Sequence, residues 1–407
     1  MSSAVSRRNV LRATSATSAV AILSYSLTST VAAQTPTFPV PPAADPRDAV
    51  QSLDDIEIVA RFFGPMPTGV TVSQGGRIFV NFPRWEDEVD ATVTELVNGE
   101  AVPFPNAEIN RLDLQRPRET FVSVQSVVVD PRDRLWVLDT GSLNFGPVVP
   151  GGPKLVAIDL GTNQVLRTIP FSPQVALPTT SLNDVRFDLR RGRDGYAFIT
   201  DASTQGPNAI IVVDLATGES VRRLNDHPTT KAEPGFVPIV EGRALMERLP
   251  GLPPMNLALG ADGIAIGADG QRLFYSPLAS RRLYSVSVDA LVDRSQSDAG
   301  VAQTVLDHGE KGASDGLESD AEGRVYLTDY EHNALRRRLP SGMYETLYFD
   351  PNGALWPDTL SLAGDGYLYF TSNQLHRLAR FNDGQDVRWR PFLLSRIAVD
   401  GTPVRLI

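Results

Sequence analysis

The feature that most constrains this 407-residue chain is a short phrase that recurs six times. Each copy begins with a small or polar residue, continues as an alternating apolar strand, turns at Asp or Gly, and ends in a strand of aromatic and β-branched residues. This pattern is typical of a β-hairpin. The copies are TGVTVSQGGRIFV (68–80), QSVVVDPRDRLWVLD (125–139), NDVRFDLRRGRDGYAFITD (183–201), DGIAIGADGQRLFYS (262–276), DGLESDAEGRVYLTD (315–329) and DTLSLAGDGYLYFTS (358–372).

Further strands follow the hairpins, for example at residues 154–159 and 209–214. A repeat of about four strands cannot bury both of its faces alone, so we expect the six repeats to close around a central channel. The sequence therefore predicts an all-β fold, a six-bladed β-propeller with a central channel, over residues 56–407. Two β-sandwiches are the main alternative, and they would not readily explain six copies that start alike. Residues 239–250 are the expected exception, as a short helix or a lid between blades.

The N-terminal residues resemble an export signal. Arg7 and Arg8 precede a weakly apolar stretch and a small-residue cleavage site, Val31-Ala32-Ala33. This order predicts a twin-arginine signal peptide over residues 1–33, with an amphipathic first helix as the alternative. The Pro-rich residues 34–55 are expected to form a tether. No later apolar run reaches the roughly 18 residues of a membrane helix, so we expect a secreted or periplasmic protein without a membrane anchor.

The composition excludes several classes of partner and site. The formal net charge is −10. Removal of residues 1–33 would subtract three arginines and no acid, which leaves −10 − 3 = −13. Nucleic acid and anionic membranes need a basic surface, so neither is an expected partner. The absence of cysteine rules out disulfides, thiolate metal sites and a cysteine nucleophile. We expect a monomer whose partner is a small-molecule ligand or substrate.

The residue before the first strand of each blade should point toward the channel axis at one mouth. These six residues are Thr68, Gln125, Asn183, Asp262, Asp315 and Asp358. All are polar, and three carboxylates that converge on one axis repel each other unless they are compensated. Hard oxygen donors of this kind suit a divalent cation, for which calcium is the expected ion.

Two other interpretations of this ring stay open. An Asp-Gly pair at the start of a strand can simply form a tight turn. A ring with a charge near −3 could instead hold a cationic amine beside an aromatic side chain. We expect Thr68, Gln125, Asn183 and Trp356 to bind the ligand. Tyr330 and Phe145 are further aromatic candidates beside a cationic amine, and packing in the core or between blades is the alternative role of all three aromatic residues. Among the four histidines, His308 and His332 are the candidates for a proton carrier at a channel mouth, with a surface or packing role as the alternative for each.

Several long phrases resemble the yellow/major royal jelly protein family. They are PTGVTVSQGGRIFVNFPRW (67–85), DPRDRLWVLDTG (130–141), SLNDVRFD (181–188), LGADGIAIGADGQRLFYSPLASRRLYSV (259–286) and HGEKGASDGLESDAEGRVYLTDYEHNAL (308–335). The resemblance implies a secreted six-bladed propeller. It also implies either dopachrome conversion or the binding of aromatic amines, because the family includes proteins of both kinds. The insect members usually carry cysteines, which this chain lacks.

The blade starts at Asp262 and Asp315 also resemble those of gluconolactonase-like propellers, which hold a catalytic divalent cation there. Asp315 matches the metal-bound aspartate of those enzymes, and Asp262 stands where they usually have asparagine. With the ring position Asn183, these residues form the expected metal site. The lactonases also use a glutamate at the first blade, where this chain has Met66-Pro67-Thr68, and this departure argues against lactone hydrolysis.

Three functions follow as hypotheses. The first is an isomerase related to dopachrome tautomerase, which moves a proton from carbon and for which Asp315 or Asp358 is the expected base. The second is metal-dependent hydrolysis of a lactone, in which Asp315 assists water. The third is non-catalytic binding of an aromatic or cationic amine.

Overall fold

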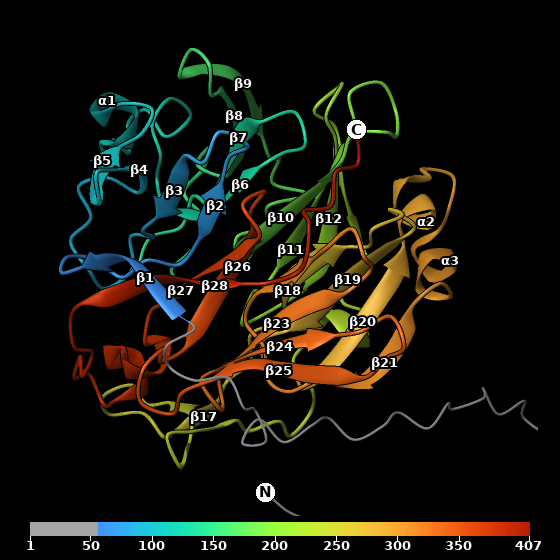
Figure 1. Ribbon diagram of the computed structural model, residues 1–407. Coiled ribbons are helices and arrows are strands. Elements are labelled where there is room, and N and C mark those ends of the chain that lie inside the picture. Colours follow the sequence, from blue (N-terminus) through green and yellow to red (C-terminus); the bar gives the residue numbers. More distant parts are fainter. Residues whose placement is uncertain (1–55) are drawn as a thin grey trace, which may run out of the picture. The chain divides into compact units, whose positions relative to one another are not determined.

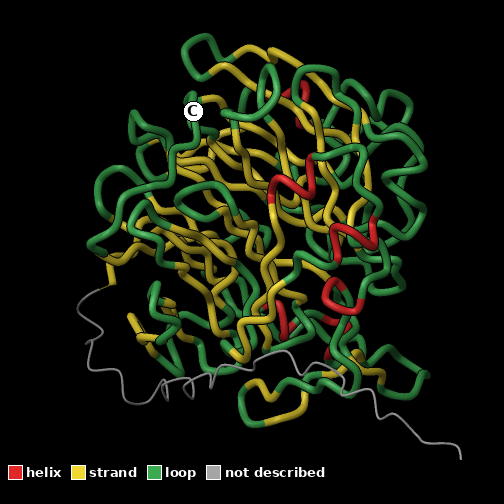
Figure 2. The backbone as a smooth tube through the Cα atoms, turned by 90° about the vertical axis from the view of Figure 1, so that its right-hand side faces the viewer, coloured by secondary structure: helices red, strands yellow, loops and turns green. Residues whose placement is uncertain are grey.

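The computed structural model describes residues 56–407, which form six four-stranded antiparallel sheets arranged as the blades of a propeller (Figure 1). The innermost strands of successive blades contact one another, and the last innermost strand contacts the first, so the ring is closed. Strands dominate the described chain and the helices are short (Figure 2). The predicted six-bladed propeller is confirmed. The predicted signal peptide and tether lie outside the described residues.

From the inner to the outer strand, the first blade consists of β2 (Val70–Val72), β3 (Ile78–Asn81), β4 (Val93–Val97) and β5 (Glu100–Pro103). The second blade consists of β6 (Val124–Val129), β7 (Arg134–Asp139), β8 (Lys154–Asp159) and β9 (Gln164–Pro170). The third blade consists of β10 (Leu182–Asp188), β11 (Tyr196–Asp201), β12 (Ala209–Asp214) and β13 (Ser220–Arg223). The fourth blade consists of β18 (Ala261–Ile266), β19 (Arg272–Pro277), β20 (Arg282–Ser287) and β21 (Leu306–Glu310). The fifth blade consists of β22 (Leu317–Ser319), β23 (Val325–Asp329), β24 (Ala334–Arg338) and β25 (Tyr344–Phe349). The sixth blade consists of β26 (Pro357–Leu362), β27 (Tyr367–Ser372), β28 (Phe392–Ala398) and β1 (Ile56–Phe62). The short helices are α1 (Ala107–Asn110), α2 (Val288–Val292), α3 (Asp298–Ala302), η3 (Pro228–Thr230), η4 (Leu375–Arg377) and η5 (Ala379–Phe381).

The sixth blade combines strands from both ends of the described chain. β1 pairs with β28 in a register that runs from Ile56 opposite Ile397 to Phe62 opposite Phe392, and Figure 1 shows the blue strand beside the red one. The Phe62 ring also packs edge-on against Phe82, which follows β3 of the first blade, with 5.2 Å between the ring centroids. The first and last blades are therefore joined by hydrogen bonds and by apolar packing.

The acidic turn between the first two strands of a blade is stabilised by local hydrogen bonds. In the second blade Asp130 accepts the backbone N–H groups of Arg132 and Arg134, and its other oxygen accepts the indole N–H of Trp136 at 2.8 Å. In the fifth blade Asp320 binds its own turn in the same way and accepts the hydroxyl of Tyr326. The Asp of the repeated phrase thus closes the hairpin and also fixes an aromatic residue of the next strand.

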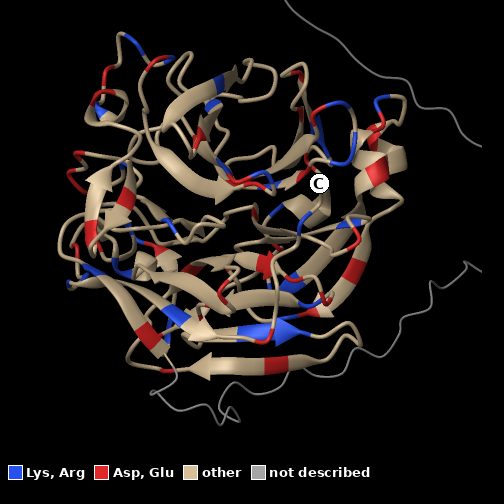
Figure 3. Ribbon diagram, turned by 45° about the horizontal axis from the view of Figure 1, so that its top comes forward, with Lys and Arg blue, Asp and Glu red and all other residues tan. Residues whose placement is uncertain are grey.

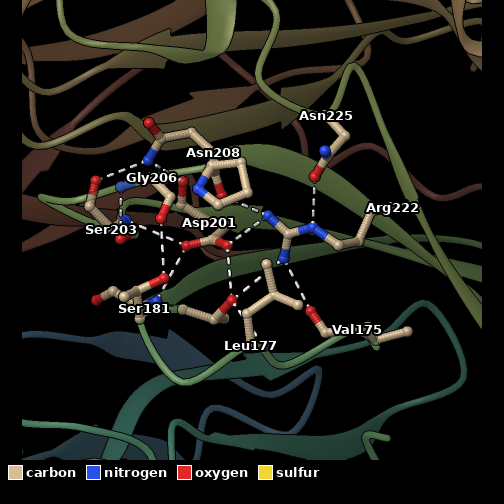
Figure 4. Close-up of polar contacts among 12 residues, drawn as sticks. Val175, Leu177, Ser181, Asp201, Ser203, Gly206, Asn208, Arg222 and Asn225 are labelled. Carbon is tan, nitrogen blue, oxygen red and sulfur yellow. Dashed lines mark hydrogen bonds and ion pairs between the residues drawn. The ribbon is translucent and has the colours of Figure 1, made fainter. Parts of the chain in front are cut away.

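A second buried aspartate, at the end of the second strand, anchors the loop before the innermost strand. Asp201 accepts the backbone N–H of Ser181 and pairs with Arg222 at 2.8 Å (Figure 4). In the second blade Asp139 holds the corresponding loop and pairs with Lys154 at 2.6 Å. Each buried charge is paired and hydrogen-bonded, as burial requires. These aspartates fix where the innermost strand begins, and hence where the ring residues lie.

Of the two alternatives expected for residues 239–250, a short helix or a lid between blades, the helix is wrong. The chain forms two small hairpins there, β14 (Ile239–Val240) with β15 (Arg243–Ala244), and β16 (Met246–Glu247) with β17 (Met255–Asn256). Glu241 and Gly242 both have positive φ, which makes a tight turn and prevents a helix. The segment is also too short for a stable isolated helix. We call residues 239–256 the lid, because they extend from between the third and fourth blades to the sixth.

Acidic and basic residues are interspersed along the blades (Figure 3). No helix within residues 56–407 is long and apolar enough to cross a membrane.

Candidate functional site at the channel mouth

Five of the six predicted ring residues line one cavity on the channel axis. They are Gln125, Asn183, Asp262, Asp315 and Asp358. Thr68 is fully buried and is not among the lining residues. Its hydroxyl accepts the amide of Asn81 at 2.8 Å and donates to the carbonyl of Gln125 at 3.3 Å. The structure thus brings five of the predicted residues together and uses the sixth to hold neighbouring blades.

An irregularity in the strand pairing turns these side chains toward the axis. The pairing of the innermost strand with its neighbour shifts at residues 124–126, 182–185, 261–264 and 357–360. A shift of this kind is a β-bulge, which re-aims side chains and is common beside functional sites. The four bulges fall on four of the ring residues. The sequence repeat marked these positions but did not reveal the bulges.

The glycines that follow Asp262 and Asp315 have a packing role rather than a turn role. A Cβ atom on Gly263 would lie 2.3 Å from the carbonyl oxygen of Asp315, and one on Gly316 would lie 2.2 Å from that of Asp358. Glycine therefore lets adjacent innermost strands approach closely. This close approach places the three carboxyl groups side by side.

The ring residues form a continuous row of polar contacts. The amide of Gln125 donates to Asn183 at 3.2 Å, and the amide of Asn183 donates to Asp262 at 2.6 Å. Asp315 lies within hydrogen-bonding reach of both Asp262 and Asp358. We call Asp262, Asp315 and Asp358 the carboxyl cluster.

Burial controls the electrostatics of the carboxyl cluster. Burial, followed by the negative charge of Asp315, raises the pKa of Asp262 and of Asp358 well above the usual range. Burial also raises the pKa of Asp315, and the N–H of Trp356 opposes that shift. A cluster of this kind holds protons or a positively charged partner at neutral pH, because three adjacent buried negative charges are strongly unfavourable.

Trp356 lies behind Asp315. Its indole N–H donates to Asp315 at 2.7 Å, and its ring stacks with those of Tyr330 and His376, with 4.2 Å and 5.6 Å between the ring centroids. The indole is fully buried and is not among the residues that line the cavity. In this structure Trp356 therefore holds Asp315, and the prediction that it contacts a ligand remains a prediction. On the other side of the cluster, the amide of Asn373 donates to Asp358.

Aromatic and basic side chains from loops complete the cavity. Trp85 and Phe145 stack at 4.3 Å, Phe381 lines another part of the wall, and the guanidinium of Arg380 lies 4.2 Å from the Phe145 ring. Phe145 was an aromatic candidate, but the sequence did not single out Trp85, Arg380 or Phe381. They lie outside the repeated phrases and carry no periodic signal. The cavity volume of about 40 Å³ holds an ion or very few waters, so a larger ligand requires side chains to move.

A second polar layer lies deeper in the channel and was also missed. Asp184 accepts the hydroxyl of Ser126 at 2.6 Å and pairs with Arg186 at 2.9 Å. Arg186 also lies 3.7 Å from Glu318, and both line a separate cavity of about 110 Å³. This buried ion triad lies between the carboxyl cluster and the second cavity.

None of the four histidines is among the residues that line the cavity of the carboxyl cluster. His308 binds Ser285 at 2.7 Å, and His332 binds Asp329 at 3.0 Å. His376 comes nearest to the cluster, through its stacking on Trp356, and was not singled out from the sequence. The suggestion that His308 or His332 carries protons at this mouth thus has no support from their positions.

The family model for the major royal jelly protein matches residues 122–392, which is more than half of the chain and includes the five cavity-lining ring residues. The chain belongs to the major royal jelly protein family. The predicted resemblance is confirmed.

Relatives within this family include insect proteins named yellow. Protein yellow of Drosophila pseudoobscura pseudoobscura is 28% identical over 248 residues, which cover 57% of this chain and 41% of the relative. Protein yellow of Drosophila melanogaster is 28% identical over 250 residues, which cover 57% of this chain and 43% of the relative. The matched region thus spans about two fifths of the length of these curated relatives.

Solved six-bladed propellers show the same fold at low sequence identity. The calcium-binding protein regucalcin from Agrobacterium tumefaciens has a TM-score of 0.50 and 15% identity, covering 86% of this chain and 97% of that protein. A putative gluconolactonase has a TM-score of 0.53 and 12% identity, covering 86% of this chain and 94% of that protein. At these identities the likeness shows the architecture alone.

The side chains of the ring are chemically compatible with the predicted divalent cation at Asn183, Asp262 and Asp315. All of the donors are hard oxygen atoms, and Oε1 of Gln125 is buried without a hydrogen-bond partner. Within residues 56–407, however, no three Asp, Glu, His or Cys side chains are grouped so that they could hold a metal ion. A site would therefore combine carboxylates with amide oxygens, and the cation remains a prediction.

Proposed function

We propose that this protein binds a small, flat molecule at the mouth of its channel and isomerises it by moving a proton from carbon, as in dopachrome conversion. The observation that carries the proposal is the carboxyl cluster, in which three buried carboxyl groups adjoin beneath aromatic walls. Membership of the family that includes the yellow proteins supports the same class of ligand.

The carboxyl cluster offers a base and an acid side by side. Burial and mutual repulsion raise the pKa values of these carboxyl groups, which favours the protonated form of some of them beside an ionised neighbour. The ionised group, Asp315 or Asp358, removes a proton from a ring carbon of an indoline quinone. The C–H electron pair moves into the ring system, and a quinone oxygen takes a proton from an adjacent carboxylic acid. No atom is gained or lost overall, so no further reactant is needed.

A divalent cation, if bound, would be held by Asn183, Asp262 and Asp315. It would supply electrophilic stabilisation of the developing negative charge on the substrate oxygen. The residues that bind and orient the substrate ring are the aromatic wall residues Trp85, Phe145 and Phe381.

Non-catalytic binding of an aromatic or cationic amine is the second candidate. It is favoured by the same combination of aromatic walls and a negatively charged floor. Lactone hydrolysis has less support, because the glutamate of the lactonases is absent. Met66 packs in the apolar core instead, and the hydroxyl of Thr68 is already hydrogen-bonded.

Export by the twin-arginine route, with the protein acting as a monomer outside the cytoplasm, belongs to the same proposal. The proposal of export rests on Arg7, Arg8 and the residues that follow them.

The experiment that tests the isomerase is conversion of L-dopachrome by the purified protein and by the Asp315→Asn and Asp358→Asn variants. Loss of the general base should lower kcat by about 10²–10⁴-fold. Asp320→Asn is the matched control, because it removes a buried carboxylate of the fifth blade that does not line the cavity. If the protein binds aromatic amines but does not convert L-dopachrome, the isomerase proposal is contradicted. Non-catalytic binding then becomes the better supported function.

A further inference from the structure

Arg380 joins the lid to the cavity. One terminal nitrogen of its guanidinium donates to Glu247 of the lid at 2.6 Å, and the group lies over the rings of Phe145 at 4.2 Å and Phe381 at 5.6 Å. The same side chain lines the cavity that contains the carboxyl cluster. Its Nε–H is buried and has no hydrogen-bond partner among the described residues. Arg380 is thus a charged residue that lines the cavity and has an unused buried donor.

An unpaired buried donor on a charged group is unfavourable, because it has lost its water without gaining an acceptor. Arginine binds carboxylates especially well, since its neighbouring N–H groups match the two oxygens. The acceptor that Arg380 lacks in the described chain would therefore be provided best by an oxyanion of the ligand.

The charges around the cavity determine where such an oxyanion can lie. Asp262, Asp315 and Asp358 line the floor and would repel it. Glu247 faces Arg380 from the lid and already occupies a different nitrogen of the guanidinium. The cavity is thus lined by the cation of Arg380, which we call its cationic end, by the three groups of the carboxyl cluster, and by aromatic side chains.

We propose that Arg380 is a specificity-determining residue that binds a carboxylate of the ligand. The inference rests on the proposed function and narrows its substrate class to flat aromatic or quinonoid rings that carry a carboxylate. In such a ligand the carboxylate lies at Arg380 and the carbon that loses its proton faces the carboxyl cluster.

Arg377 provides a matched control for the contact with the lid. It forms an ion pair with Glu241 of the lid, as Arg380 does with Glu247. Its guanidinium, however, packs over Trp389 at 3.7 Å and does not line the cavity. Removal of Arg377 weakens the attachment of the lid but leaves the cationic end of the cavity in place.

The test measures the binding of indole-2-carboxylate and of indole, two stable rings that differ by one carboxylate, to the full chain and its variants. The wild type should prefer indole-2-carboxylate by roughly tenfold to a hundredfold, the range expected for a charge-assisted hydrogen bond. Arg380→Met should abolish the preference, Arg380→Lys should restore part of it, and Arg377→Met should retain it. Thermal melts confirm that each variant is folded.

Equal binding of the two rings by the wild type, or binding of neither, would overturn the inference. An Arg380→Met variant that keeps the preference for indole-2-carboxylate would also overturn it. If that variant loses affinity for both rings by the same factor, the role of Arg380 is purely structural and the inference is likewise overturned. Turnover separates the two proposals. A preserved preference without dopachrome conversion refutes only the isomerase. Equal kcat/KM for L-dopachrome and for dopaminochrome, which lacks the carboxylate, refutes only the role of Arg380.

Discussion

At the scale of residues, side chains at consecutive positions line the channel beside the ring in some of the blades. Asn183 and Asp184 both do so, as do Gln125 and Ser126. In a regular strand neighbouring side chains point to opposite faces, and the bulge in the innermost strand relaxes that rule. This explains why alignment of the repeats identified Asn183 and missed Asp184, one residue further along.

The predicted cation can be tested directly on the carboxyl cluster. Metal analysis of the purified protein should find about one divalent ion per chain, and a chelator should lower the Tm, because ligand binding stabilises the folded state. Asp315→Ala should lose the ion. Asp358→Ala is the control that should keep it, since Asp358 adjoins the predicted ligands without being one of them. A wild type that is free of metal and indifferent to chelator would exclude the metal site.

At the scale of elements, the lid depends on ion pairs with the loop that follows β27. Glu241 contacts His376 at 3.0 Å and forms an ion pair with Arg377, and Arg243 donates to Asn382 at 2.6 Å. These contacts join residues more than a hundred positions apart. They also bring the lid close to the cavity, because His376 stacks on Trp356 behind Asp315.

The attachment of the lid should weaken in acid. The hydrogen bond with His376, followed by that with Arg377, lowers the pKa of Glu241 from 4.5 to about 2. Its contribution to stability is therefore complete above pH 4.5 and is lost as the pH falls from 4.5 through 2. Burial lowers the pKa of His376 below 6.5, so its protonation below that pH also weakens the attachment of the lid.

The measurement is the difference in Tm between the wild type and Glu241→Gln at a series of pH values. We expect a difference of about 2 °C at neutral pH, because partly exposed ion pairs contribute little. It should shrink toward zero between pH 4.5 and pH 2. A difference that stays constant across this range would show that the Glu241 carboxylate is not the group that holds the lid.

At the scale of the whole molecule, closure of the ring depends on β1. This strand supplies the outer edge of the sixth blade, and Phe62 at its end packs against the first blade through Phe82. No other strand within residues 56–407 pairs with β28 on that side. The stability of all six blades should therefore be sensitive to this one strand.

The adjacent residues Phe62 and Phe63 offer a matched test of this closure. Phe62 is 6% exposed and Phe63 is 69% exposed. Phe62→Ala should lower the free energy of unfolding by about 3–5 kcal/mol, since it leaves a cavity between the first and last blades. Phe63→Ala should change it by less than about 0.5 kcal/mol. Chemical denaturation measures both, and similar effects of the two substitutions would contradict a closing role for β1.

The sequence is enough to predict the number of blades and five of the six positions that line the cavity at the channel mouth, because both follow from a local pattern that recurs six times. It also pointed to the family, through phrases that lie within single blades. Asp262, Asp315 and Asp358 could be predicted in this way, since each stands at the same place in its repeat.

The residues that surround those carboxyl groups can be identified only from the folded chain. The second oxygen-bearing layer at Asp184, the support of Asp315 by Trp356 and the cationic end at Arg380 depend on contacts between different blades and loops. The expected helix over residues 239–250 gave way to hairpins for the same reason, because contacts with the sixth blade outweighed a weak local preference. Contacts between distant segments leave no periodic trace in the sequence, and they determine which side chains line the cavity.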